Sequence, residues 1–107
     1  MSLKIHIRKD GGAYPVITCD HCFGLIDDVR NANALWLETT DEGRERERLY
    51  ETVHVHKRCD RLFEAANPAE ADQFWMSHEL EHDVCMMLAN AGYNPRAAEA
   101  RAKLRMP

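Results

Sequence analysis

Two short pairs of residues in this sequence have the types and the spacing of metal ligands. The first pair is Cys19 and Cys22 in the segment "CDHC", and the second is His56 and Cys59 in "HKRC". Two residues separate the members of each pair, so that neighbouring side chains can converge on one ion from a tight turn. Three thiolates and one imidazole form a donor set that Zn²⁺ prefers in tetrahedral sites. The sequence therefore predicts one structural zinc ion with four ligands: Cys19, Cys22, His56 and Cys59.

Another histidine, His54, lies two residues before the second pair. The segment "VHVH" alternates as a half-buried strand does, so the imidazoles of His54 and His56 lie on the same face. We expect His56 to be the ligand because its gap to Cys59 repeats the gap between the two cysteines of the first pair. His54 is then expected either to lie just outside the ligand set or to replace His56 in it.

The cellular compartment affects how the four cysteines are interpreted. The apolar runs are too short to span a membrane, and the first residues lack the apolar core of a signal peptide. We therefore expect a cytoplasmic protein, in which closely spaced cysteine and histidine residues bind metal rather than form disulfides. Two alternatives remain: a redox pair at Cys19 and Cys22, or cysteines that only pack in the core. The "FGLIDD" that follows Cys22 shows no clear helix, which a thioredoxin-like redox pair would begin.

Alternating sequence patterns predict the strands that position the two pairs. Residues 3–7 alternate apolar and basic side chains, "DGG" at 10–12 indicates a turn, and 14–18 form the returning strand. Residues 34–39 and 49–56 are two further strands, joined by a polar hairpin loop, "TDEGRE", at 40–45. The first pair then lies in a turn after the first hairpin, and the second pair lies where a strand gives way to a helix.

Helices are predicted for most of the second half of the chain. A helical pattern begins at Arg58, with Leu62 and Phe63 on its apolar side. Asn67 and Pro68 resemble an N-cap and a first helical residue, which predicts a long helix over 68–91 that ends before Gly92. A short helix follows the second "NP", at 94–95. The apolar residues expected to cover the sheet from the long helix are Met76, Leu80, Val84, Met87 and Leu88.

This order of elements, a Cys-x-x-Cys turn, a hairpin and then ligands at the start of a helix, resembles a treble-clef zinc finger. The Cys-x-x-Cys…His-x-x-Cys order is similar to the first zinc module of LIM domains. The resemblance covers residues 17–66. It departs from LIM modules because the 33 residues between the pairs make a longer loop and no second ligand set follows. The resemblance implies a structural zinc ion and a binding or scaffolding role.

These patterns together predict an α+β fold in a single domain over residues 1–107. Its zinc-binding core is residues 17–66, with a hairpin before it and a helical extension at 68–105. A chain of this length buries a small core, to which a structural metal adds useful stability.

The segment "HELEH" at 78–82 matches the zincin signature, in which two histidines bind zinc and the glutamate activates water. Glu81 places a charge between the histidines, and no third zincin ligand follows. On the predicted helix, His78 and His82 lie on the solvent face opposite Leu80, beside Cys85. The favoured interpretation is that the two histidines belong to a charged helix face and that Cys85 is a packing thiol. Two hypotheses are less favoured: a small metalloprotease that uses Glu79, and a second ligand cluster of His78, His82 and Cys85.

Charge and composition bear on the partners. With 14 basic and 18 acidic residues the formal net charge is −4, which argues against a non-specific nucleic-acid binder. We expect a non-catalytic binding or adaptor protein with a protein partner and no membrane contact. The alternative is a nucleic-acid-binding zinc-finger regulator that uses the arginines of the C-terminal tail together with Arg44, Arg46, Arg48, Lys57, Arg58 and Arg61. The interleaved acids count against this alternative: Glu45, Glu47, Glu51 and Asp60.

Overall fold

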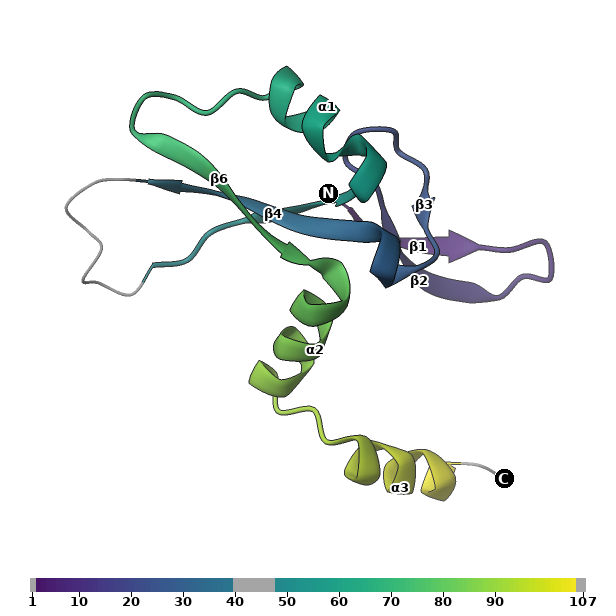
Figure 1. The fold of residues 1–107 in the computed structure, drawn as a ribbon. Helices are drawn as coiled ribbons and strands as arrows, with labels where there is room; N and C mark the ends of the chain where they lie inside the picture. Colours follow the sequence, from purple (N-terminus) through teal and green to yellow (C-terminus); the bar gives the residue numbers. More distant parts are fainter. Residues whose placement is uncertain (1, 40–47, 106–107) are drawn as a thin grey trace.

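The computed structural model describes residues 2–39 and 48–105. Within them the chain forms two antiparallel three-stranded sheets and three α-helices, which confirms the α+β class (Figure 1). The strands are β1 (Leu3–Ile7), β2 (Ala13–Thr18), β3 (Leu25–Ile26), β4 (Ala32–Thr39), β5 (Thr52–His56) and β6 (Gln73–Glu79). The helices are α1 (Asp60–Ala66), α2 (Leu80–Asn90) and α3 (Pro95–Arg105), with short 3₁₀ turns at Val29–Asn31 and Lys57–Cys59.

The first sheet has the order β1-β2-β3 and contains the predicted N-terminal hairpin. Its turn is closed by the side chain of Asp10, whose Oδ1 accepts a hydrogen bond from the Gly12 amide at 2.7 Å. Gly11 has φ +84°, a left-handed conformation that glycine adopts without steric cost. The "DGG" segment therefore acts as the predicted turn.

The second sheet has the order β5-β4-β6, so β4 is its central strand. Successive residues of β4 belong to different buried clusters, because successive side chains of a strand point to opposite faces. Leu35 packs with Val55 and Phe63 in the cluster that also contains two of the cysteines, whereas Ala34 packs with Leu80 of α2. The predicted hairpin loop at 40–45 lies outside the described residues.

The predicted long helix over 68–91 is wrong in its first half. Residues 73–79 form β6, which pairs antiparallel with β4 from Asn33 to Thr39, and helix α2 begins only at Leu80. Asn67 ends α1 rather than beginning a helix, since its amide N–H and its side-chain Nδ2 both donate to the Phe63 carbonyl. The open edge of β4 offers seven residues of ladder pairing, and this pairing outweighs a local capping signal.

Only some of the apolar residues that were predicted to cover the sheet from the long helix are buried. Leu80 is fully buried and Val84 packs beside it, as predicted. Met76 lies on β6 instead, and Met87 and Leu88 are exposed. Trp75 joins the core from β6, where its ring meets Phe63 edge-on at 5.5 Å between ring centroids. Its Nε1 donates to the Asn67 carbonyl at 2.9 Å.

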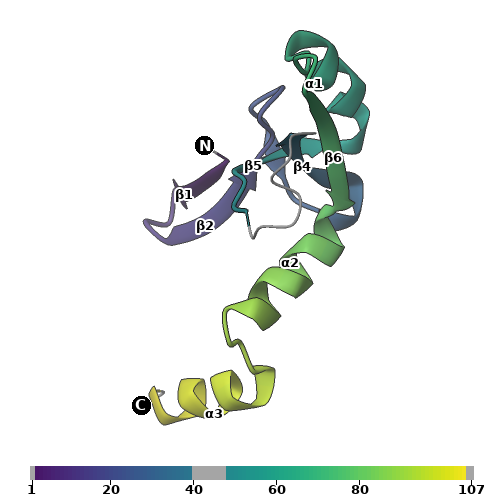
Figure 2. The same cartoon turned by 90° about the vertical axis from the view of Figure 1, so that its left-hand side faces the viewer.

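The end of α2 and the start of α3 agree with the sequence prediction. Gly92 follows α2 with φ +77°, and the Tyr93 amide donates to the Leu88 carbonyl at 2.9 Å, as in a glycine C-cap. Asn94 caps α3 by accepting hydrogen bonds from the amides of Arg96 and Ala97. Figures 1 and 2 show that α2 leads away from the sheets and that α3 lies apart from both of them. No helix in the described part of the chain has the length and apolar character needed to cross a membrane.

Candidate metal centre

The structure brings the four predicted ligand side chains to one place. One ligand atom from each lies within 4.8 Å of the others: Cys19, Cys22, His56 and Cys59. The Cys22 Sγ and His56 Nδ1 atoms are 3.3 Å apart. Among the residues that the structure describes, no other group of three or more cysteine, histidine or acidic side chains is arranged in this way.

The first pair lies in a tight turn directly after β2. The turn is held by backbone hydrogen bonds from Phe23 to the Cys19 carbonyl and from Cys19 to the Gly24 carbonyl, both at 2.8 Å. The amides of His21 and Cys22 point back at the Cys19 Sγ, at 3.4 and 3.5 Å. These amides would stabilise a thiolate at Cys19, and the same geometry leaves both sulfur atoms facing one side of the turn.

The second pair lies where β5 gives way to α1. His56 is the last residue of β5, and Cys59 ends the 3₁₀ turn just before the helix. The His56 Nε2 lies 3.0 Å from the Leu25 carbonyl, which can only accept a hydrogen bond. The ring proton is therefore on Nε2, and Nδ1 presents its lone pair to the three sulfur atoms. Metal-binding histidines commonly use such a hydrogen bond to fix the tautomer and the ring orientation.

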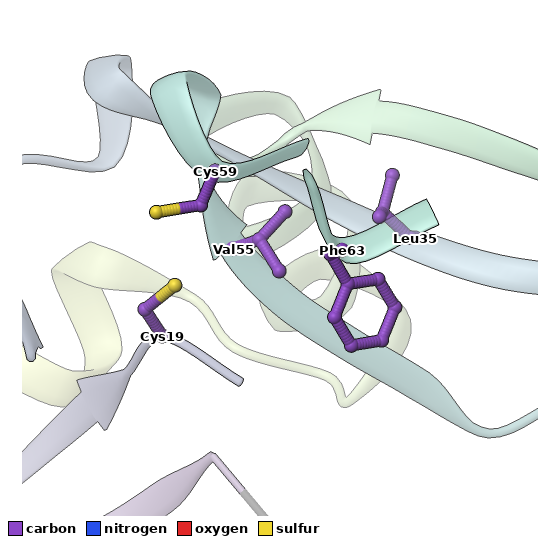
Figure 3. Close-up of a cluster of buried hydrophobic side chains, with 5 residues drawn as sticks. All are labelled: Cys19, Leu35, Val55, Cys59 and Phe63. Atoms are coloured by element: carbon purple, nitrogen blue, oxygen red, sulfur yellow. The ribbon is translucent and has the colours of Figure 1, made fainter. Parts of the chain in front are cut away.

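The pKa values of the two inner cysteines shift in opposite directions. Cys19 and Cys59 are both buried, and Figure 3 shows their sulfur atoms facing the same space beside Val55. Burial raises the pKa of Cys59, and the neighbouring thiols of Cys19 and Cys22 raise it further, to about 11. Burial also raises the pKa of Cys19, but hydrogen bonds from the amides of Cys22, His56 and His21 lower it by more, to about 6.

His54 lies next to this centre but outside the ligand set. Its ring nitrogen Nδ1 is hydrogen-bonded to the Ser2 hydroxyl, so the ring is turned toward the N-terminal segment. Its backbone joins the two ligand segments: the His54 amide donates to the Asp20 Oδ2 at 2.8 Å, and the Asp20 amide donates to the His54 carbonyl at 2.7 Å. Burial lowers the pKa of His54, while the charges of Asp20 and Asp83 oppose that shift.

Two supporting groups were not predicted. Asp20 lies between the two cysteines of the first pair, and its carboxylate accepts the hydrogen bond from the His54 amide. A carboxylate at this position in the sequence could have indicated such a supporting role. The Leu25 carbonyl that orients His56 carries no signal in the sequence, because any residue offers the same backbone group.

The "HELEH" segment does not have the geometry of a zincin. His78 lies in β6 and His82 in α2, so the two are not one turn apart on a single helix. The His78 ring packs edge-on against Trp36, and its Nδ1 lies 3.3 Å from the Asp83 Oδ1. The prediction that His78 lies on the solvent face of a helix is therefore wrong. Glu79 faces Lys57 at 3.4 Å. Cys85 is an exposed thiol, and in the described part of the chain it forms no metal-binding cluster with the two histidines.

The chemistry of the donor set selects a class of metal. Three sulfur atoms and one imidazole nitrogen suit Zn²⁺ and other soft or borderline ions, whereas Ca²⁺ and Mg²⁺ require oxygen ligands. The four cysteines are unpaired thiols, so no disulfide competes for the sulfur atoms. The residues present therefore fit a tetrahedral zinc ion.

No protein-family model matches this chain, and no curated protein and no solved structure matches it. The features of this chain that bear on function are therefore the geometry of the candidate metal centre and the surfaces around it.

Proposed function

We propose that this protein is a zinc-stabilised, non-catalytic binding protein with one structural Zn²⁺ ion. The observation that supports this proposal best is the convergence of four ligand atoms from two segments that are far apart in the sequence: Cys19, Cys22, His56 and Cys59. Such a set fills all four positions of a tetrahedral zinc ion and leaves none for a water molecule or a substrate. Structural sites are closed in this way, whereas catalytic sites keep one position open.

The surrounding elements support a treble-clef arrangement. The first pair lies in a turn, the β4–β5 hairpin follows, and the second pair lies at the start of α1, which is the order of that class of zinc finger. The ion would link the end of the first sheet to the strand and helix of the second. Among the described residues few large side chains are fully buried, so a link of this kind would supply stability that the small core lacks. The largest fully buried side chains are those of Leu35, Leu80 and Val55, followed by Cys19.

The first test is metal analysis of the purified protein in reducing buffer. We expect about one zinc ion per chain, because the four ligands form a single site. A zinc content near zero in a chain that keeps its circular-dichroism spectrum and thermal transition would contradict the proposal.

Cys85 provides a matched control for substitution of a ligand. It is a free cysteine like the other three and is exposed like Cys22, but it lies outside the candidate centre. Cys59→Ser should lose zinc and unfold the central part of the chain, because the binding energy of a structural zinc ion is largely folding energy. Cys85→Ser should keep both the zinc and the thermal transition. Equal behaviour of the two variants would contradict the assignment of Cys59 as a ligand.

The binding role is supported by apolar side chains that the fold leaves in solvent. Every residue of β1 is exposed, including three large aliphatic side chains. Exposed apolar surface of this kind is typical of a site that contacts another protein.

A further inference from the structure

We propose that the open edge of β1 binds an extended segment of a partner protein, in which acidic and apolar residues alternate, as an additional strand of the first sheet. This inference deepens the proposed binding role and rests on it. Within residues 2–39 and 48–105, β1 pairs with β2 only, and Figure 2 shows it at the outer edge of its sheet. An edge strand offers unpaired backbone groups, which a partner strand can use.

The hydrogen-bond pattern shows which backbone groups are open. At one end of the hairpin the Thr18 amide donates to the Ser2 carbonyl at 2.7 Å, and at the other the Arg8 amide donates to the Gly12 carbonyl at 3.0 Å. Residues of an antiparallel pair alternate between facing the neighbouring strand and facing away from it. The even-numbered residues from Ser2 to Arg8 therefore bond to β2, and the odd-numbered ones point their N–H and C=O groups outward.

Pro15 agrees with this pattern independently. It lies opposite Ile5, and proline has no N–H to donate. Because Ile5 directs its own backbone groups away from β2, no ladder hydrogen bond is lost at this pair. Three residues, Leu3, Ile5 and Ile7, are thus left with an outward donor and an outward acceptor each.

The side chains of these three residues form an apolar row on one face of the sheet. Leu3, Ile5 and Ile7 are 63%, 62% and 63% exposed. A shallow cavity of about 580 Å³ runs along this part of the hairpin, lined in part by Pro15, Ile17 and Ile26. An added strand would place its alternate side chains beside this row, where apolar residues gain from burial.

The opposite face of β1 is basic and determines what kind of strand fits. Lys4 and His6 lie on that face, and Arg8 follows with its guanidinium 3.8 Å from the centre of the Tyr14 ring. None of these three side chains forms an ion pair with any described residue. A strand with acidic residues at alternate positions would place carboxylates next to them, and opposite charges stabilise cross-strand pairs.

The same charges disfavour a second copy of this chain at the edge. If two β1 strands paired antiparallel around Ile5, Lys4 of each would lie diagonally beside Lys4 and Arg8 of the other, on one shared face. Like charges on neighbouring positions of paired strands repel each other and destabilise the pair. The observations therefore favour an acidic partner segment over self-association.

Amide hydrogen exchange of the zinc-loaded full chain tests the proposal. The probe is a short blocked peptide of alternating glutamate and valine, and the control is the same peptide with lysine in place of glutamate. Saturating glutamate peptide should slow exchange at Leu3, Ile5 and Ile7 by at least about tenfold. The amides of Lys4 and His6, which already bond to β2, should change little, and the lysine peptide should leave all of them unchanged.

Two substitutions at one position separate the backbone from the side chain. Ile5→Pro removes the outward N–H without removing a bond to β2, whereas Ile5→Ala shortens the side chain and keeps that N–H. We expect Ile5→Pro to bind the glutamate peptide at least about fivefold more weakly than Ile5→Ala does. Lys4→Glu combined with His6→Glu should reverse the preference between the two peptides.

Three results would overturn the proposal. One is unchanged exchange at the odd-numbered amides with saturating glutamate peptide, and another is equal protection by both peptides. The third is protection of these amides without peptide that increases with protein concentration, because a second copy then occupies the edge. Zinc content is measured on the same sample, so a failure of the proposed metal centre is read separately from a failure of the docking site.

Discussion

Cys19 and Cys59 belong to the same candidate metal centre, yet they hold their protons very differently. Amide hydrogen bonds bring the pKa of Cys19 to about 6, whereas burial and the nearby thiols bring that of Cys59 to about 11. At neutral pH, Cys19 is therefore largely a thiolate and Cys59 a thiol. A metal ion binds thiolates, so it must displace the Cys59 proton.

The affinity for zinc should accordingly fall as the pH is lowered. Protons compete with the metal for the thiolates. Below about pH 6 Cys19 is mostly protonated as well, so zinc affinity should fall more steeply with pH there. Competition with a chromophoric chelator between about pH 5 and pH 8 measures this dependence. Zinc binding at neutral pH should also release protons into a weakly buffered solution. An affinity that does not vary over this range would contradict the assignment of thiolate ligands.

The two histidines of "VHVH" should respond differently to substitution. His56→Ala removes a ligand and should weaken zinc binding by more than about a hundredfold. His54→Ala removes the hydrogen bond to Ser2 but no ligand, and its backbone bonds to Asp20 remain, so zinc affinity should change little. The same chelator competition measures both variants. A large loss in His54→Ala together with a small one in His56→Ala would reverse the assignment.

At the level of single residues, the sequence was sufficient to predict which side chains come together. The two-residue gaps specify ligand pairs whatever the fold, because they depend only on local chain geometry. The orientation of His56 was not predictable, since it depends on the Leu25 carbonyl, a backbone group brought close by tertiary structure. His54 lies just outside the ligand set, which is one of the two positions expected for it, but its hydrogen bond to Ser2 was not predictable because Ser2 is distant in sequence.

Among the elements, the clearest failure of sequence reasoning is β6. Asn67 and Pro68 carry the local chemistry of a helix start, but the residues after them gain a ladder on the open edge of β4. Phe74 and Trp75 are aromatic residues that favour strands, a signal that competed with the capping pattern. Three features were predictable because residues close in the sequence form their turns and caps. They are the hairpin over 3–18, the end of α2 and the start of α3.

Leu80 connects β6 and α2 to the central strand, and its substitution tests that connection. It is the first residue of α2, is fully buried, and packs against Ala32 and Ala34 of β4. Leu80→Ala should lower the free energy of unfolding by about 2–5 kcal/mol, since it leaves a cavity at a buried site. Met87→Ala, at a residue of α2 that is 51% exposed, is the control and should change it by less than about 0.5 kcal/mol. Chemical denaturation measures both, and similar values would contradict the packing described for α2.

The molecule as a whole is more extended than a compact domain of its size. Its radius of gyration is 17.0 Å, whereas a compact chain of this length has about 13 Å. The extents of 57 × 36 × 19 Å reflect α2 and α3, which lead away from the sheets (Figures 1 and 2). The open edge of β1 and the exposed helices therefore lie on different parts of an elongated surface, which would give the proposed binding role more than one region for contact.

Removal of α3 tests whether this helix belongs to the folded core. Its residues are mostly exposed, and Leu104 is 86% exposed, so little apolar surface is buried against the rest of the chain. A chain that ends after Asn94 should keep its zinc and its free energy of unfolding to within about 0.5 kcal/mol. Its radius of gyration in small-angle X-ray scattering should fall, because the helix extends the long axis. A loss of stability comparable to that of Leu80→Ala would instead mean that α3 packs on the rest of the chain in solution.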